Sequence, residues 1–340
     1  MNGTLKAFLI FLLILALLAG GAFLYYRAEV SGLFRSSEPV AVHIEKGSSA
    51  AAVADSLKEA GVIGNTYVFR FYLRSHPASF QYGTFSLTPR SGYDAVIREL
   101  ESGAVQRDSE TLTVTEGSSV PEIADQLVKL GLGSREEILD VMENEPFAFD
   151  FLPEKAEGAL YRLEGYLFPD TYEIYPDATR ENIVSVVEKM LKNFEVKTAE
   201  LRQEAAKQEK DWRELVILAS IVEKEGQKAE ELPVISAVFQ NRLADGMKLE
   251  SCATVQYVLP EHKEVLTYED IAVESPYNTY LYEGLTPGPI GNPGLLALKA
   301  ALQPADSDYY FFVARADGSH YFARTYAEHE ANIQKSNSEG

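Results

Sequence analysis

The first hydrophobic pattern along the chain is a long apolar run near its start. Residues 7–26 carry no charge and are flanked by Lys6 and Arg27. As a helix these twenty residues would span about 30 Å, the thickness of a bilayer core. A cleaved signal peptide is the alternative, but its apolar core is usually only about 7–15 residues long. The pattern therefore favours an uncleaved transmembrane helix at 7–26.

The residues around this run predict a single-pass protein of the cell membrane. The short tail at 1–6 ahead of a much larger polar part favours a cytoplasmic N-terminus and an extracytoplasmic bulk. Residues 27–39 are polar, contain Gly and Pro, and are typical of a linker.

The next pattern is an internal repeat. Residues 42–61 resemble residues 112–131 at a constant offset of 70 and without a gap. Each copy predicts a short strand, a turn at a glycine, and a helix that begins after a capping serine and ends at a second glycine. The capping serines are Ser49 and Ser119, and the terminal glycines are Gly61 and Gly131. The unit is similar to LysM-type modules, which bind amino-sugar polymers, although a duplicated scaffold without a ligand explains it equally well.

The remaining patterns predict a mixed α+β fold. Between and after the copies the spacing of apolar residues predicts helices at 67–74, 92–100 and 134–144 and a strand at 80–87. We therefore expect a LysM-like domain at 40–108, a second repeat-like α/β segment at 109–150, a catalytic domain at 151–335 and a tail at 336–340.

Composition narrows the function classes. The 340 residues carry a formal net charge of −20, and an acidic surface argues against nucleic acid as a partner. Residues 1–27 hold two bases and no acid, so the rest carries −22. One cysteine cannot form an internal disulfide, and five scattered histidines give no helical metal-ligand spacing. The sequence contains no phosphate-loop motif and no nucleophile-elbow motif. We expect neither a metal nor a cofactor.

The most unusual segment places two glutamates directly after an apolar run. Residues 215–222 predict a buried helix, and Glu223 and Glu225 follow it. The two are about 200° apart around a helix, so they face opposite ways. Glu225 follows the more apolar face, where a partly desolvated carboxyl would have a raised pKa and could act as a general acid. An ordinary solvated helix end is the alternative.

A second candidate region is aromatic and then rich in glycine and proline. Residues 277–282 contain three tyrosines and an asparagine, and seven of the eleven residues at 284–294 are Gly or Pro. Aromatic rings and an amide suit sugar rings, whose apolar faces are ringed by hydroxyls. A purely structural turn is the alternative here.

Taken together, these segments resemble the YceG-like endolytic murein transglycosylases, the MltG family. The matching segments are LEGYLFPDTY at 163–172, ASIVEKE at 219–225, VFQNRL at 238–243, TVQY at 254–257, SPYNTY at 275–280, GPIGNPG at 288–294 and YFFV at 310–313, with His320, Phe322, Thr325 and His329. They occur in family order, and the resemblance covers about residues 40–335.

The resemblance implies that Glu225 is the catalytic residue. As an acid it would protonate the glycosidic oxygen between N-acetylmuramic acid and N-acetylglucosamine in nascent peptidoglycan. As a base it would then take the proton of the muramic 6-hydroxyl and close a 1,6-anhydro ring, with no metal, cofactor or second carboxylate. Asp170, Asn241, Tyr277 and Asn278 are predicted to contact the substrate.

Two other functions remain open from the sequence. In a hydrolytic muramidase, Glu225 would be the acid while Asp170 or Glu274 activated a water. A non-enzymatic peptidoglycan-binding scaffold needs only the repeat and the anchor. The resemblance also implies contacts with cell-wall synthases.

One departure from the family pattern lies at 251–254. The sequence there is Ser-Cys-Ala-Thr, where many relatives carry Asp-Pro before the threonine. We expect Cys252 to be a packing residue.

Overall fold

The computed structural model describes residues 3–102 except 46, and residues 109–339 except 264. The chain forms two compact units, Met1–Ser109 and Glu110–Gly340. Residues 103–108, which end the predicted LysM-like domain, lie outside the described part. The same holds for residues 1–2 of the predicted N-terminal tail and for residue 340.

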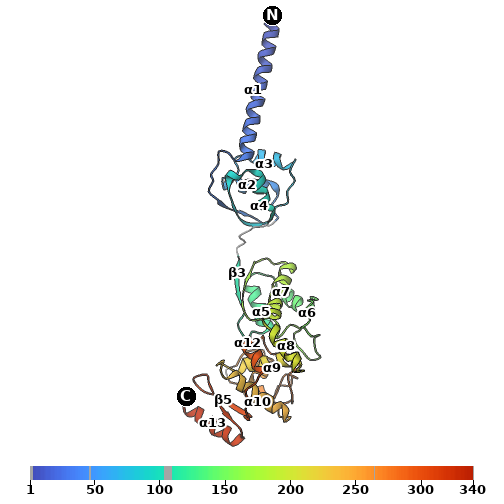
Figure 1. The fold of residues 1–340 in the computed structure, drawn as a ribbon, viewed down its shortest axis with the longest axis vertical. Coiled ribbons are helices and arrows are strands. Elements are labelled where there is room, and N and C mark those ends of the chain that lie inside the picture. The colour runs from blue at the N-terminus through green and yellow to red at the C-terminus, as the bar shows by residue number, and fades with distance from the viewer. Residues whose placement is uncertain (1–2, 46, 103–108, 264, 340) are drawn as a thin grey trace. The chain divides into compact units, whose positions relative to one another are not determined.

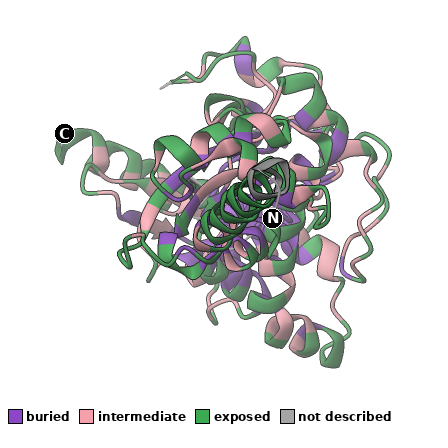
Figure 2. Cartoon of the chain, turned by 90° about the horizontal axis from the view of Figure 1, so that it is seen from above, coloured by how far each residue is buried: buried purple, intermediate pink, exposed green. Residues whose placement is uncertain are grey.

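The first unit begins with helix α1 (Gly3–Ser31), which contains a stretch long and apolar enough to cross a membrane, Leu9–Ser31. Residues 9–25 of this stretch are exposed, as the helix seen end-on in Figure 2 shows, and the last turns beyond them are partly covered by the rest of the unit. This helix is a candidate membrane anchor, as the apolar run predicted. It continues through the first five residues of the predicted linker and ends before Gly32, whose φ of +66° is left-handed.

The rest of the first unit is a small α/β core around the first copy of the repeat (Figure 1). Its elements are β1 (Val40–Ile44), α2 (Ala50–Glu59), α3 (Thr66–Leu73), β2 (Gly83–Leu87) and α4 (Tyr93–Ser102). Strands β1 and β2 pair antiparallel, with Val42 opposite Phe85. The predicted elements and the cap at Ser49 are confirmed, since Ser49 accepts a hydrogen bond from the amide of Ala52.

The second unit is mainly helical, with two short antiparallel pairs. Its elements are β3 (Glu110–Thr113), α5 (Val120–Lys129), α6 (Arg135–Asn144), β4 (Thr171–Ile174), α7 (Arg180–Lys197), α8 (Ala199–Lys207), α9 (Trp212–Glu225), α10 (Leu232–Ala244), α11 (Cys252–Gln256), α12 (Leu295–Leu302), β5 (Phe311–Ala314), β6 (His320–Ala323) and α13 (Tyr326–Glu339). One hydrophobic core runs from Leu112 to Leu302, so the segment predicted at 109–150 shares its core with the predicted catalytic domain.

The predicted mixed α+β class with one N-terminal apolar helix is confirmed. In the second copy β3 pairs with β4, so that Leu112 lies opposite Tyr172, about 60 residues further along the chain. Likeness of the two copies to LysM modules remains a prediction, as does glycan binding by them.

Candidate active site

Helix α9 is the element that carries the two candidate glutamates. Asp211 caps its start, because its carboxylate accepts hydrogen bonds from the amides of Arg213 and Glu214. All eight residues at 215–222 are buried, as the apolar run predicted. The helix ends at Glu225, where it reaches the surface of the core.

Glu223 and Glu225 have different surroundings, as their spacing predicted. The Glu223 carboxylate accepts a hydrogen bond of 2.9 Å from the amide of Gly294, which precedes α12. Burial raises its pKa, and this hydrogen bond lowers it in part. Glu223 therefore joins α9 to the start of α12.

Glu225 instead contacts the segment that begins α11. The Ser251 hydroxyl donates a hydrogen bond of 2.5 Å to Oε1 of Glu225, and the Ala253 amide donates another to the same carboxylate. Protein atoms surround the carboxyl while the residue stays partly exposed. Burial raises the pKa of Glu225, and the hydrogen bonds and a positive charge on His320 offset this only in part. A carboxyl that holds its proton near neutral pH can serve as a general acid.

Glu225 lines a cleft of about 570 Å³. Its walls come from the end of α9, from α10, from residues 249–252, from Tyr280, and from β5, β6 and α13. The lining includes both tyrosine and phenylalanine rings and charged side chains, as suits a carbohydrate. The cleft thus combines a raised-pKa carboxyl with a surface that a glycan strand could contact.

Arg242, on α10, stabilises the wall of the cleft that α10 contributes. Its buried guanidinium donates to the backbone carbonyls of Tyr310 and Lys248, and it forms an ion pair of 3.0 Å with Glu250. The guanidinium carbon also lies 4.9 Å from the centre of the Phe311 ring. One arginine therefore holds α10, the 248–250 segment and β5 together.

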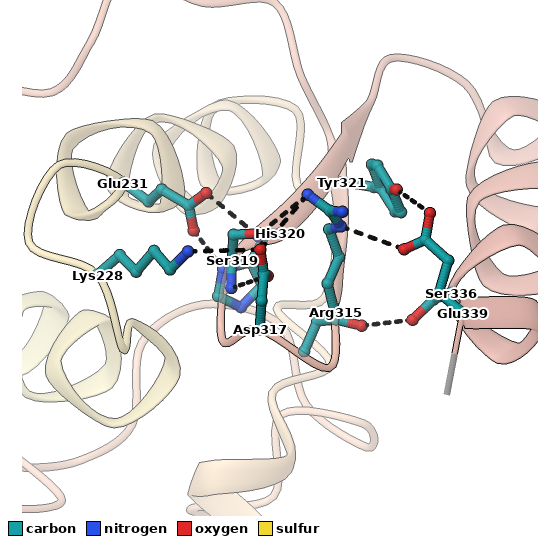
Figure 3. Close-up of polar contacts among 10 residues, drawn as sticks. Lys228, Glu231, Arg315, Asp317, Ser319, His320, Tyr321, Ser336 and Glu339 are labelled. Carbon is teal, nitrogen blue, oxygen red and sulfur yellow. Dashed lines mark hydrogen bonds and ion pairs between the residues drawn. The ribbon is translucent and has the colours of Figure 1, made fainter.

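His320, at the start of β6, lines the same cleft. Figure 3 shows its polar contacts with Glu231. Its Nδ1 lies 2.8 Å from a carboxylate oxygen of Glu231, and its backbone amide donates to the other oxygen. Next to it Lys228 and Asp317 form an ion pair of 3.6 Å. Glu231 fixes the ring through Nδ1, which leaves Nε2 as the nitrogen available to the cleft.

Comparison with known proteins decides the family. The model of the YceG-like family matches residues 42–335, which include the Glu225 cleft and both copies of the repeat. The chain belongs to the YceG-like family.

Named relatives and a crystal structure agree with this assignment. The chain is 34% identical to an endolytic murein transglycosylase of Bacillus subtilis, over 94% of this chain and 91% of the relative. A second endolytic murein transglycosylase, from Streptococcus pneumoniae, is 31% identical over 96% of this chain, which spans 65% of that longer relative. A crystal structure of a putative YceG-like protein from Listeria monocytogenes matches with a TM-score of 0.60 and 33% identity, covering 87% of this chain and 99% of the other.

Two of the residues predicted to contact substrate in this YceG-like chain lie outside the lining of the Glu225 cleft. Asp170 is exposed and accepts a hydrogen bond of 3.0 Å from Asn193, and it lies 3.8 Å from the ammonium group of Lys197. Tyr277 is buried, and its hydroxyl accepts a hydrogen bond from the amide of Leu160. Neither side chain lines the Glu225 cleft.

The two predicted asparagines are also absent from the cleft lining. Asn241 donates 2.9 Å hydrogen bonds to backbone carbonyls at 307 and 309. Asn278 is fully buried and donates to carbonyls at 271 and 273. Their amides satisfy backbone groups of neighbouring loops, which positions those loops.

The glycine- and proline-rich loop at 284–294 packs against the second copy of the repeat. Asn292 is buried, accepts a hydrogen bond from the amide of Leu167, and donates to Ser118 and Glu164. A Cβ on Gly291 would lie 2.5 Å from a backbone oxygen of the turn at 117, so only glycine fits. The structural alternative describes this loop best.

The sequence interpretation did not link Glu225 to Ser251, which donates a hydrogen bond to it, or to His320, whose charge lowers its pKa. Ser251 and His320 are polar residues in loops and strand ends, and no local spacing links either to α9. Cys252 corrects our expectation of a packing residue: it is exposed and lines the cleft, with its sulfur 3.0 Å from the Tyr280 hydroxyl. Cys252 is the first residue of α11, whose buried side is formed by Thr254 and Val255.

Proposed function

We propose that this chain is a membrane-anchored endolytic transglycosylase that uses Glu225 as its general acid and base. The coarser part of this statement follows from the family: the chain is a transglycosylase, and the named relatives act on murein. The finer part of the proposal is that the enzyme cleaves the bond between N-acetylmuramic acid and N-acetylglucosamine in nascent peptidoglycan strands. Helix α1 would hold the enzyme in the cell membrane with its N-terminus in the cytoplasm.

The observation that carries the proposal is the carboxyl of Glu225 at the cleft. Because burial raises its pKa, the carboxyl is protonated over a wider pH range and can donate to the glycosidic oxygen. The bond from the anomeric carbon to that oxygen then breaks, and the oxygen leaves as a hydroxyl. The Ser251 hydroxyl, 2.5 Å from Oε1, stabilises the carboxylate that this step produces.

The second step returns the proton to Glu225. The carboxylate takes the proton of the muramic 6-hydroxyl, and that oxygen bonds to the anomeric carbon to close the 1,6-anhydro ring. No water is consumed, so one carboxyl suffices for both steps.

The placement of the other carboxylates supports this route over hydrolysis. Most glycoside hydrolases use a second carboxylate, either as a base that activates water about 6.5–9.5 Å from the acid or as a nucleophile about 5–5.5 Å from it. Asp170 and Glu274, the candidates for that role, do not line the Glu225 cleft. Glu250 does line it, but its carboxylate is paired with Arg242.

The decisive experiment is a digest of purified peptidoglycan by the full chain in heavy-oxygen water, followed by mass spectrometry of the new ends. We expect 1,6-anhydro ends without heavy oxygen. Glu225→Gln should lower the rate by about 10²–10⁴-fold, because the amide cannot donate or accept the proton.

Glu223→Gln is the matched control, because it lies on the same helix and its amide oxygen can still accept from Gly294. We expect it to keep most of the activity. Reducing ends that carry heavy oxygen would instead identify a hydrolase. Binding without cleavage by the unsubstituted chain would identify a scaffold. Contacts with cell-wall synthases rest on the resemblance alone and stay a prediction.

A further inference from the structure

The end of α1 is bound tightly into the first unit. The Glu29 carboxylate, in the last turn of α1, accepts hydrogen bonds from the amides of Gly64 and Asn65 at 2.7 and 2.9 Å. It also accepts from the Tyr93 hydroxyl at 2.8 Å and pairs with Arg35 at 2.6 Å. A buried carboxylate with four partners fixes the helix to the unit, so the span and the unit move together.

The distance of Glu29 from the end of the apolar run determines how deep in the membrane this attachment lies. The uncharged run ends at Tyr26, and Glu29 lies three residues further along, a rise of about 4.5 Å. The polar headgroup layer on each side of a bilayer is about 5–7 Å thick. The backbone that Glu29 binds therefore lies at the depth of the headgroups whenever 7–26 spans the hydrocarbon core.

Helix α3 starts at that attachment and lies against the last turns of α1 (Figure 1). Asn65, which caps α3, donates a hydrogen bond of 3.2 Å to the Tyr25 hydroxyl. Further along, the Phe71 ring meets the Tyr26 ring edge-on, with 6.2 Å between their centres. Helix α3 is thus held beside the two tyrosines at the end of the apolar run.

The outer face of α3 carries the side chains typical of a membrane interface. Phe69 and Tyr72 point into the core of the unit. On the opposite face Tyr67 is 79% exposed and Phe71 is 60% exposed. Arg70 and Arg74 are exposed at positions three and seven residues after Tyr67, which places them on the same face. Aromatic rings with arginines are enriched where protein meets headgroups.

We propose that this face of α3, formed by Tyr67, Arg70, Phe71 and Arg74, lies in the headgroup layer of the membrane that α1 crosses. The partner is the lipid surface itself, with anionic headgroups opposite the two arginines. The inference rests on α1 as the anchor in the proposed function, and it adds a second contact that seats the first unit directly on the bilayer.

The test measures the depth of single positions in the full chain, reconstituted in vesicles of phosphatidylethanolamine and phosphatidylglycerol. In a Cys252→Ser background, Tyr67→Cys and Phe71→Cys are labelled with a nitroxide, and spectroscopy compares relaxation by oxygen with relaxation by a water-soluble nickel chelate. Ser102→Cys is the control, since it lies at the other end of α4 from Tyr93, about 14 Å away along the helix. We expect the ratio of oxygen to nickel relaxation to be several-fold higher at 67 and 71 than at 102.

Two outcomes overturn the inference and can be told apart. If the chain floats with the vesicles but positions 67 and 71 are as accessible to nickel as 102, the face of α3 lies in water and only this inference fails. If the chain does not float with the vesicles, the anchor fails as well. Transglycosylase activity does not enter either measurement. Tyr67 contributes little packing at 79% exposure, so Tyr67→Cys remains informative if the substitution at Phe71 disturbs the fold.

Discussion

The two copies of the repeat have the same local structure and different surroundings. In each, a serine caps the helix, and Leu57 or the equivalent Leu127 is buried on one helical face. The first copy pairs its strand with β2 and forms the core of a small unit of its own. The second pairs with β4 and belongs to the core that contains α9. The same local sequence thus serves once as an independent unit and once as part of the support of the candidate catalytic helix.

The difference arises from contacts that only the second copy makes. The amide of Gly117 donates a hydrogen bond of 2.8 Å to the Asn292 carbonyl. The amide of Val120, at the start of α5, donates to the buried Glu164 carboxyl at 3.0 Å. Both partners lie outside the repeat. The second copy is therefore joined to the loops that border α9, and substitutions there should affect the active site while equivalent ones in the first copy should not.

The largest effects should come from removing the equivalent core leucines. Leu57→Ala and Leu127→Ala each delete a fully buried side chain and should each lower the free energy of unfolding of their own unit by about 2–5 kcal/mol. The single tryptophan, Trp212, lies on α9, so its fluorescence reports the second unit selectively. We expect Leu127→Ala to shift the fluorescence transition and Leu57→Ala to leave it in place. A shift caused by Leu57→Ala would mean that the two units unfold together.

The next effect concerns Glu164 and pH. Burial raises the pKa of Glu164 to about 8 from an ordinary 4.5, against the hydrogen bond from Tyr257. The folded state therefore holds a proton that the unfolded state releases, and the free energy of unfolding falls as pH rises from about 4.5 to 8. Glu164→Gln should remove this fall in the free energy of unfolding, which is on the order of 3 kcal/mol between pH 5 and pH 8. Denaturant titrations followed by Trp212 fluorescence at pH 5 and pH 8 measure it.

Glu188→Gln is the control for the pH experiment, since that carboxylate is exposed on α7 of the same unit. It should keep the slope of the unsubstituted chain. An unchanged slope in Glu164→Gln would contradict the raised pKa of Glu164.

Alanine substitutions at the two turn glycines should have similar effects on stability but different effects on activity. Gly47 and Gly117 have the same φ of +77°, so alanine at either should cost about 1–2 kcal/mol. A Cβ at Gly117 would lie 3.6 Å from Glu223 and Lys224, whereas no atom lies within 4 Å at Gly47. Because those residues form the last turn of α9, Gly117→Ala should also slow peptidoglycan cleavage a few-fold, and Gly47→Ala should not. Equal rates in both variants would show that the turn does not influence Glu225.

What the sequence could predict follows from the range of the interactions. The caps, the terminal glycines and the buried run of α9 depend on residues within a turn or two of each other, and these predictions are confirmed. The pairing of β3 with β4 joins segments about 60 residues apart, and the contact of Ser251 with Glu225 joins different helices. No periodicity or spacing encodes such pairs.

The residues predicted to contact the substrate illustrate a related point. Asn278 and Tyr277 have the chemistry of a sugar-binding site, but in the structure both are buried and bonded to backbone groups. From sequence, a polar side chain that serves a neighbouring loop cannot be distinguished from one that faces a cleft. The raised pKa of Glu225 could be predicted, because an apolar run directly before a carboxylate is a local pattern with an electrostatic consequence.

The smallest effect should come from the capping serines, and it tests whether the copies differ even in their local structure. Ser119 forms a full capping box with Glu122, whereas the Ser49 hydroxyl accepts one hydrogen bond of 3.3 Å from the amide of Ala52. Alanine should cost about 1 kcal/mol or more at 119 and somewhat less at 49. Calorimetry of the full chain, with Trp212 fluorescence to identify the second unit, would measure both. A larger loss at 49 than at 119 would mean that surroundings outside the caps, and not the reciprocal hydrogen bonds, determine the stability of these helix starts.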